Sequence, residues 1–430
     1  MQSDPLRQEP SRPALLDAAV AQSDSWLDTH RDDLLSFCGD LLRTPSDNPP
    51  GDCATIADLA ASTCDRLGLG TTRLAVPRPN APDCPIVLAW CGQETSEPAL
   101  VANAHLDVIP PGPGWTVDAY GGGAMDGRVY GRGAAASKTD VAAYVFALAA
   151  VRSVIGSAIP TSAVVALTSD EETGGSYGPR WLLDEYGLKP RLAICPGSTH
   201  RVATAHNGCV QATVELTATP QHAATASPSS DAWPAALRIL RRLEELRIAL
   251  SERRSDVPGI ETANLVVSGI HGGGSPGVTM GSVTITIDRR VLPEEDMDAA
   301  LVELRDAVLT PSGEAVRVQF EATLVAAAMR PTSSQRILAE TVRAEASRVL
   351  NTPVATSGVP IFTDARWFAG AGIPTVMFGV GYPDPAEGNG HGPDENAGVA
   401  EIEATARIMA RVMLRILQMD DVAPTAGLSA

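Results

Sequence analysis

The segments "ALVANAHLD" (99–107) and "TSAVVALTSDEE" (161–172) decide the predicted fold. Each is a short apolar run typical of a buried strand, and each ends in polar side chains. Between them, "KTDVAAYVFALAAVRSVI" (138–155) is long enough to be a helix. Strands that alternate with helices indicate an α/β domain with a mostly parallel sheet, whose functional groups gather at the carboxyl ends of the strands.

Polar pairs stand at both predicted strand ends. His105 and Asp107 lie two residues apart, as a metal ligand and the carboxylate that orients its ring can do. Glu171 and Glu172 can place one carboxylate toward a metal and leave the other as a general base. His391, in the loop sequence "GHGPDE", is a third candidate. Taken singly, these patterns also fit surface histidines and a solvated acidic turn.

The middle of the chain has a different pattern. The segments "VQATVELTAT" (210–219) and "GSVTITIDRRVL" (281–292) alternate apolar and polar residues, as half-exposed antiparallel strands do. Between them, "DAWPAALRILRRLEELRIAL" (231–250) has the spacing of an amphipathic helix. We therefore predict a smaller α+β insertion that divides the α/β domain. The predicted ranges are 1–206 and 326–430 for the α/β domain and 207–325 for the insertion.

Composition limits the classes of partner. With 430 residues and 44% hydrophobic content, the chain can bury two cores. A formal net charge of −18 repels phosphate backbones and anionic lipid, so we expect neither nucleic acid nor a membrane surface as a partner. We see no secretory signal and no apolar run long enough to span a bilayer. Seven irregularly spaced cysteines do not form a disulfide framework, and we expect a cytoplasmic protein.

Considered together, the motifs resemble one known family. The chain is similar to the co-catalytic zinc metallopeptidases and amidohydrolases that include aminoacylase, carboxypeptidase G, acetylornithine deacetylase and succinyl-diaminopimelate desuccinylase. The motifs that carry the resemblance, in order, are "HLDVIPPGPGW", "MDGRVYGRGA", "SDEETGG", "HNG", "QHAATA", "IDRRVLPEE", "TDARWFAGAGIPTVMFG" and "HGPDE". The resemblance implies a zinc-peptidase-like α/β catalytic domain interrupted by a ferredoxin-like lid that mediates homodimerisation.

The resemblance also implies roles for individual residues. His105 resembles the ligand of one metal, and Glu172 and His391 resemble ligands of the other. Glu171 resembles the general base, and Asp107 the residue that orients His105.

Two further roles fall in the predicted lid. His222 resembles a lid histidine that polarises the scissile carbonyl in the neighbouring subunit's site. Arg290 resembles an arginine that binds a substrate carboxylate, for which its planar two-pronged cation is suited. An exposed charge on the lid sheet is the alternative reading of Arg290.

The sequence departs from the family pattern at two ligand positions. Ala136 stands where the family has an aspartate that bridges both metals, and Cys195 stands where it has a glutamate or aspartate before proline. Cys195 is a possible zinc ligand or a small buried residue. Asp140 is an alternative ligand, although an acid satisfied by the helix N-terminus is the simpler interpretation. Engineering could have removed the aspartate, but Thr139 also deviates from the pattern, which favours natural divergence.

Two hypotheses of function follow. The first is a hydrolase that cleaves an amide bond in an N-acylated amino acid or dipeptide-like small molecule, with one or two zinc ions activating water and Glu171 as the base. The second is a repurposed family member, with zinc reduced or absent, that uses the same pocket for cyclisation, elimination or amide formation. A binding role without catalysis gives no reason to keep the base beside the remaining ligands.

Overall fold

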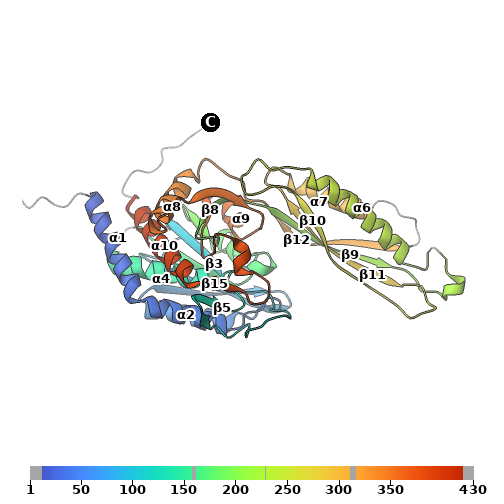
Figure 1. The fold of residues 1–430 in the computed structure, drawn as a ribbon, viewed down its shortest axis with the longest axis horizontal. Helices are drawn as coiled ribbons and strands as arrows, with labels where there is room; N and C mark the ends of the chain where they lie inside the picture. The colour runs from blue at the N-terminus through green and yellow to red at the C-terminus, as the bar shows by residue number, and fades with distance from the viewer. Residues whose placement is uncertain (1–11, 157–160, 228, 310–315, 420–430) are drawn as a thin grey trace, which may run out of the picture. The chain divides into compact units, whose positions relative to one another are not determined.

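A mixed sheet of eight strands forms the core of the part of the chain that carries the predicted site (Figure 1). The structure is a computed structural model that describes residues 12–156, 161–227, 229–309 and 316–419. The strands, in spatial order, are β1 (Gly70–Arg78), β2 (Ala81–Cys91), β6 (Ala163–Thr168), β3 (Leu100–His105), β7 (Ala193–Cys195), β14 (Thr375–Met377), β8 (Arg201–His206) and β13 (Ala355–Val359).

The centre of this sheet is parallel and one edge is antiparallel. Strand β3 pairs in parallel with β6 and β7, and β7 pairs in parallel with β14. Strands β1 and β2 add the antiparallel edge next to β6. The parallel strands end at one edge, so the residues that follow β3, β6, β7 and β14 are brought together.

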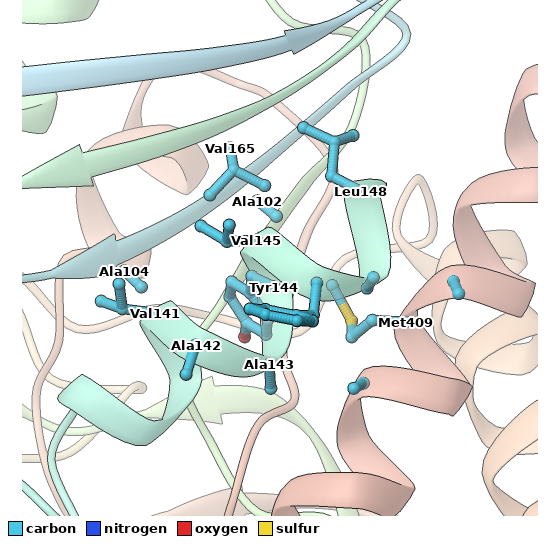
Figure 2. Packing of buried hydrophobic residues seen from close by; sticks show 14 of the residues in the cluster. Ala102, Ala104, Val141, Ala142, Ala143, Tyr144, Val145, Leu148, Val165 and Met409 are labelled. Atoms are coloured by element: carbon cyan, nitrogen blue, oxygen red, sulfur yellow. The ribbon is translucent and has the colours of Figure 1, made fainter. Parts of the chain in front are cut away.

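Helix α4 (Lys138–Ile155) is buried against this sheet. Its residues 138–151 are all buried, which agrees with a sequence that is almost entirely apolar. Figure 2 shows Val141, Val145 and Leu148 on the side of the strands and Met409, on α10 (Val399–Met419), near the opposite side. The other α-helices outside the segment 203–331 are α1 (Arg12–Thr29), α2 (Arg31–Arg43), α3 (Ala54–Arg66), α5 (Pro179–Asp184), α8 (Arg336–Val349), α9 (Ala365–Gly370) and α10.

A three-stranded sheet joins two distant segments of the chain. It consists of β4 (Ala124–Met125), β5 (Arg128–Tyr130) and β15 (Asn396–Gly398), with β5 in the middle. In the β15–β5 pair, Asn396 lies opposite Tyr130. The pairing places the turn after β5 beside the loop that precedes β15.

A separate antiparallel sheet carries two helices. Its strand order is β10 (Asn264–Gly272), β11 (Ser282–Val291), β9 (Gly208–Thr217) and β12 (Arg317–Ala326). Along the chain, α6 (Trp233–Ser251) follows β9 and α7 (Met297–Leu309) follows β11. This βαββαβ order and strand arrangement are those of a ferredoxin-like fold. The alternating apolar residues of the strands pack with both helices in a second core.

The chain divides into two compact units. The first comprises residues 1–202, 332–356 and 367–430, and the second comprises 203–331 and 357–366. An α/β unit with a mixed sheet and a second unit with an antiparallel sheet confirm the predicted fold class. The predicted domain boundaries at 207 and 325 stay a prediction.

Two further observations bear on the sequence analysis. Within the described residues, no helix is both long and apolar enough to cross a bilayer. None of the seven cysteines, all of which lie in the described ranges, forms a disulfide, and all are buried. The expectation of a cytoplasmic protein stays a prediction.

Candidate metal centre

The candidate site lies where two parallel strands end. His105 is the last residue of β3 and pairs with Thr168, the last residue of β6. The short helix η1 (Glu171–Thr173) begins three residues after β6. The strand pairing therefore brings Glu171 and Glu172 next to His105, although more than 60 residues separate them in the sequence.

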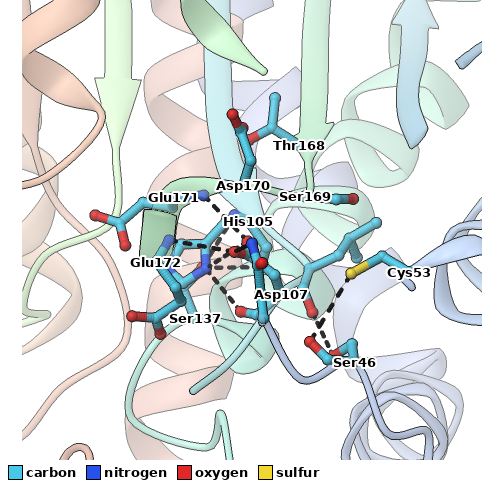
Figure 3. A network of polar contacts seen from close by, with 12 residues as sticks. Ser46, Cys53, His105, Asp107, Ser137, Thr168, Ser169, Asp170, Glu171 and Glu172 are labelled. Carbon is cyan, nitrogen blue, oxygen red and sulfur yellow. Dashed lines mark hydrogen bonds and ion pairs between the residues drawn. The ribbon is translucent and has the colours of Figure 1, made fainter. Parts of the chain in front are cut away.

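Three side chains at this edge form a potential metal-binding group. His105, Glu171 and Glu172 each offer a ligand atom, and these atoms lie within 4.8 Å of one another (Figure 3). In the part of the chain that the structure describes, this is the one group of three or more histidine, cysteine or carboxylate side chains found with such spacing. His391 joins it from a distant loop, with its Nε2 3.3 Å from Oε1 of Glu172.

Asp107 holds the ring of His105 and the backbone of both glutamates. Nδ1 of His105 lies 2.9 Å from the backbone carbonyl oxygen of Asp107 and 3.4 Å from its Oδ1. Because a carbonyl oxygen only accepts, Nδ1 carries the proton and Nε2 is left to face a cation. The carboxylate of Asp107 accepts the backbone amides of Glu171 and Glu172, each at 3.2 Å. These contacts fit the predicted role of Asp107 as the residue that orients the ring of His105.

Asn48 also contacts Asp107, and the sequence analysis missed it. The side chain of Asn48 is buried, and its Nδ2 lies 2.9 Å from Oδ2 of Asp107 and 3.2 Å from Oγ1 of Thr173. In the sequence, "DNPPG" (47–51) indicates only a turn. A turn pattern gives no information about a hydrogen-bond partner 59 residues away.

The surrounding carboxylates raise the pKa of both histidines. Burial by itself lowers the pKa of His105, but the interaction with Asp107 and the charges of Glu171 and Glu172 together raise that pKa well above its usual value. The hydrogen bond with Glu172 raises the pKa of His391. Protons and a divalent cation therefore compete for the same imidazoles.

The turn between β5 and α4 contributes no carboxylate to this group. The backbone amides of Ala135 and Ala136 donate to Oε1 of Glu395, at 2.8 and 3.2 Å. The other oxygen of Glu395 lies 2.5 Å from NH1 of Arg132 in a buried ion pair. Glu395 is thus already engaged, and the methyl group of Ala136 leaves the expected bridging position without a ligand.

Cys195 and Asp140 lie outside the potential metal-binding group. Cys195 is the buried last residue of β7. Asp140 is buried in the first turn of α4, where its Oδ1 accepts the backbone amide of Val380 at 2.7 Å. Burial raises the pKa of Asp140 to about 8, which favours the neutral acid at pH 7. The structure therefore gives no support to either residue as a ligand.

His222 and Arg290 belong to the second unit. His222 is exposed, and its Nδ1 accepts the backbone amide of Ala224 at 3.2 Å, which leaves Nε2 as the nitrogen that carries the proton. Arg290 is half-buried and paired with Asp288, with Nε 2.8 Å from Oδ1 and NH2 3.2 Å from Oδ2. A substrate carboxylate at Arg290 must share this guanidinium with Asp288.

The residues present fit one cation better than two. His105, Glu172 and His391 supply the nitrogen and oxygen ligands that zinc accepts. Oε1 of Glu172 is buried, and its partner in the described residues is Nε2 of His391 at 3.3 Å, so two candidate ligand atoms face each other. A second cation lacks a bridging carboxylate at Ala136, and without such a charge the repulsion between two cations is not offset.

Comparisons with known proteins agree with this architecture. Residues 101–415 match the model of peptidase family M20/M25/M40. A succinyl-diaminopimelate desuccinylase of Rhodospirillum centenum is 30% identical over 400 residues, which cover 89% of this chain and 97% of that protein. Human carnosine dipeptidase 1 has a similar fold, with a TM-score of 0.74 at 18% identity over 93% of this chain and 100% of that chain. A dinuclear metal-binding peptidase of the same family from Bacillus subtilis superposes with a TM-score of 0.62 at 13% identity, over 91% and 99% of the two chains.

Proposed function

Because the chain belongs to peptidase family M20/M25/M40, whose members are metal-dependent hydrolases, we propose that it cleaves an amide bond in an N-acylated amino acid or a dipeptide-like substrate. Membership confirms the family predicted from the motifs. The observation that carries the proposal is the convergence of His105, Glu172 and His391, with the carboxylate of Glu171 beside them.

The proposed chemistry assigns one task to each side chain. A zinc ion bound at this site would lower the pKa of a water molecule and polarise the amide carbonyl. Glu171 takes a proton from the attacking water and delivers it to the leaving amine. Asp107 keeps Nδ1 of His105 protonated, so that Nε2 remains the ligand atom. His222 of a neighbouring subunit donates from its Nε2 to the carbonyl oxygen as negative charge develops there.

The relatives and Arg290 support a proposal for the substrate class. The relative from Rhodospirillum centenum acts, by its name, on a succinylated diamino acid, which carries several carboxylates. Arg290 offers a half-buried guanidinium that already binds the carboxylate of Asp288. We therefore infer that the amino-acid part of the substrate has a free carboxylate, which replaces or shares the contact with Asp288.

A homodimer is part of the same proposal. Strand β10 lies at an edge of its sheet, and Val266 and Ile270 on this strand are 47% and 49% exposed. A second copy could pair with this edge and cover the exposed residues. His222 would then act in the partner's site.

Metal content and activity, measured together, test the proposal. Protein purified without added metal is assayed by elemental analysis and against a panel of N-acyl amino acids and dipeptides, before and after treatment with a chelator. Activity that is lost with the metal and returns with zinc supports hydrolysis at this site. Full activity in metal-free protein would defeat it and favour the non-hydrolytic alternative, for which the missing carboxylate at Ala136 is the motivating observation.

A further inference from the structure

A buried ion pair links the turn after β5 to the loop that carries His391. We propose that Arg132 and Glu395 are positioning residues, which hold this turn and this loop in place for cation binding. The turn itself has no carboxylate that could bind a cation and be held by it. The second half of this inference, on cation binding, rests on the proposed function. The first half, on loop position, does not.

Glu395 fixes the turn through its backbone. Its carboxylate is fully buried, and one oxygen accepts the amides of both Ala135 and Ala136. Hydrogen bonds to an ionised acceptor are stronger than those between neutral groups. Glu395 therefore holds the backbone at the position where the family carries its bridging aspartate.

Arg132 fixes the loop. Its side chain is 1% exposed, and NH1 pairs with Glu395. NH2 donates to the carbonyl oxygens of Pro111, at 2.9 Å, and His391, at 3.2 Å. One guanidinium thus connects the segment after β3, the turn after β5 and the backbone of the candidate ligand His391.

The loop before β15 needs such contacts. Asn389, His391 and Asp394 all have positive φ values, of 48°, 63° and 54°, which non-glycine residues rarely adopt. Conformations of this kind persist only where surrounding contacts determine them. Arg132 supplies such a contact, because it donates to the carbonyl oxygen of His391, one of these three residues.

The side chain of His391 depends on this backbone position. Its Nε2 lies 3.3 Å from Oε1 of Glu172, so a small displacement of the loop separates two candidate ligands. In a site with a bridging aspartate, the bound cations would connect the turn that carries the aspartate to the other metal ligands. Ala136 cannot form such a link, so Arg132 and Glu395 must hold the turn and the loop through the protein alone.

Glu395→Gln and a matched control test the inference. Glutamine keeps an oxygen that can accept the two amides but removes the charge that pairs with Arg132. The control is Glu345→Gln on α8, which weakens another arginine–glutamate pair in the same unit, between the buried Glu345 and the half-buried Arg415 of α10. Hydrogen exchange of peptides spanning 131–140 and 388–396 is measured in chelator-treated protein, and cobalt(II) affinity is measured by absorption.

We expect Glu395→Gln to speed exchange in both peptides by about tenfold or more and to weaken cobalt binding by about 10- to 100-fold, as loss of a residue that orients metal ligands does. Glu345→Gln should leave both quantities at wild-type values. A folded Glu395→Gln protein with wild-type exchange in both peptides, or with faster exchange but unchanged cobalt affinity, would overturn the inference.

Two outcomes need a second measurement. If Glu395→Gln does not fold, Arg132→Lys is used instead, because lysine keeps the charge but loses the planar reach to both carbonyl oxygens. The same faster exchange and weaker binding are then expected, and wild-type values would overturn the inference. If the wild-type protein binds no cobalt, the proposed function fails, and the exchange measurements alone decide whether the pair positions the loops.

Discussion

Replacing Asp140 by asparagine tests whether this acid is a structural residue or the missing metal ligand. Asp140 is 1% exposed, and its Oδ1 accepts the amide of Val380 at 2.7 Å. Asparagine keeps an oxygen for this hydrogen bond and nearly the same volume, but it cannot ionise. Asp140→Asn therefore isolates the effect of the charge.

The magnitude follows from the pKa of Asp140. Burial raises it from 3.8 to about 8, so between pH 5 and pH 7 the folded protein keeps a proton that the unfolded chain has lost. The folded state then binds one more proton than the unfolded state, and the free energy of unfolding falls as the pH rises, by about 1.4 kcal/mol per pH unit. From pH 5 to pH 7, the free energy of unfolding of the wild type should therefore fall by about 2.7 kcal/mol relative to that of Asp140→Asn. The contribution of the neutral Asp140 to the free energy of unfolding is fully present below pH 3.8 and is lost as the pH rises toward 8.

Urea denaturation of chelator-treated wild type and Asp140→Asn at pH 5, 6 and 7 measures this difference. Of the six tryptophans, only Trp233 lies in the second unit, so tryptophan fluorescence reports mainly on the first unit, which contains Asp140. Asp140→Ala is the control: it also lacks the charge, but it leaves the amide of Val380 without its acceptor and should be destabilised at every pH. A constant difference between wild type and Asp140→Asn across this pH range would refute the assigned protonation. Loss of metal from Asp140→Asn would identify Asp140 as a ligand.

Three further predictions concern catalysis and metal content. Glu171→Gln should lose several orders of magnitude in turnover with folding and metal content nearly unchanged, because only the basic group is removed; near-normal turnover would exclude Glu171 as the base. Mixing Glu171→Gln chains with His222→Ala chains should restore part of the activity in heterodimers, and no recovery after proven subunit exchange would place His222 in its own site or outside catalysis. The double variant Ala136→Asp, Cys195→Glu should raise the metal content measured by elemental analysis toward two equivalents per chain, since it recreates the family's ligand set; unchanged content would show that the turn is misaligned with the family pattern.

The meeting of His105 with the two glutamates could be predicted because it depends on local patterns. Buried parallel strands such as β3 and β6 are mostly apolar, so polar residues at their carboxyl ends mark the functional edge of the sheet. The helix over 138–155 was predicted correctly for a similar reason, since α4 has the same bounds. In contrast, the helical apolar spacing of "SWLDTHRDDLLSFCGDLLRT" (25–44) does not reveal that this segment forms parts of two helices, with His30 between α1 and α2.

The supporting residues could not be predicted because their partners are distant in sequence. Asn48 and Glu395 act through hydrogen bonds between loops, which leave no periodic pattern. The burial of Asp140 was also hidden, because an acid in the first turn of a helix is ordinarily solvated. Segment 357–366, which returns to the second unit, was likewise not foreseen.

This return of the chain limits how the protein can be rearranged by recombination. The chain crosses between the two units four times, after residues 202, 331, 356 and 366. If residues 203–331 were removed alone, segment 357–366 would stay behind without the unit that it packs with. The amide of Gly358 in this segment donates to the carbonyl oxygen of Pro258 at 2.6 Å. The second unit is therefore not a portable module, and a chimera that exchanges it with a relative must transfer both segments together.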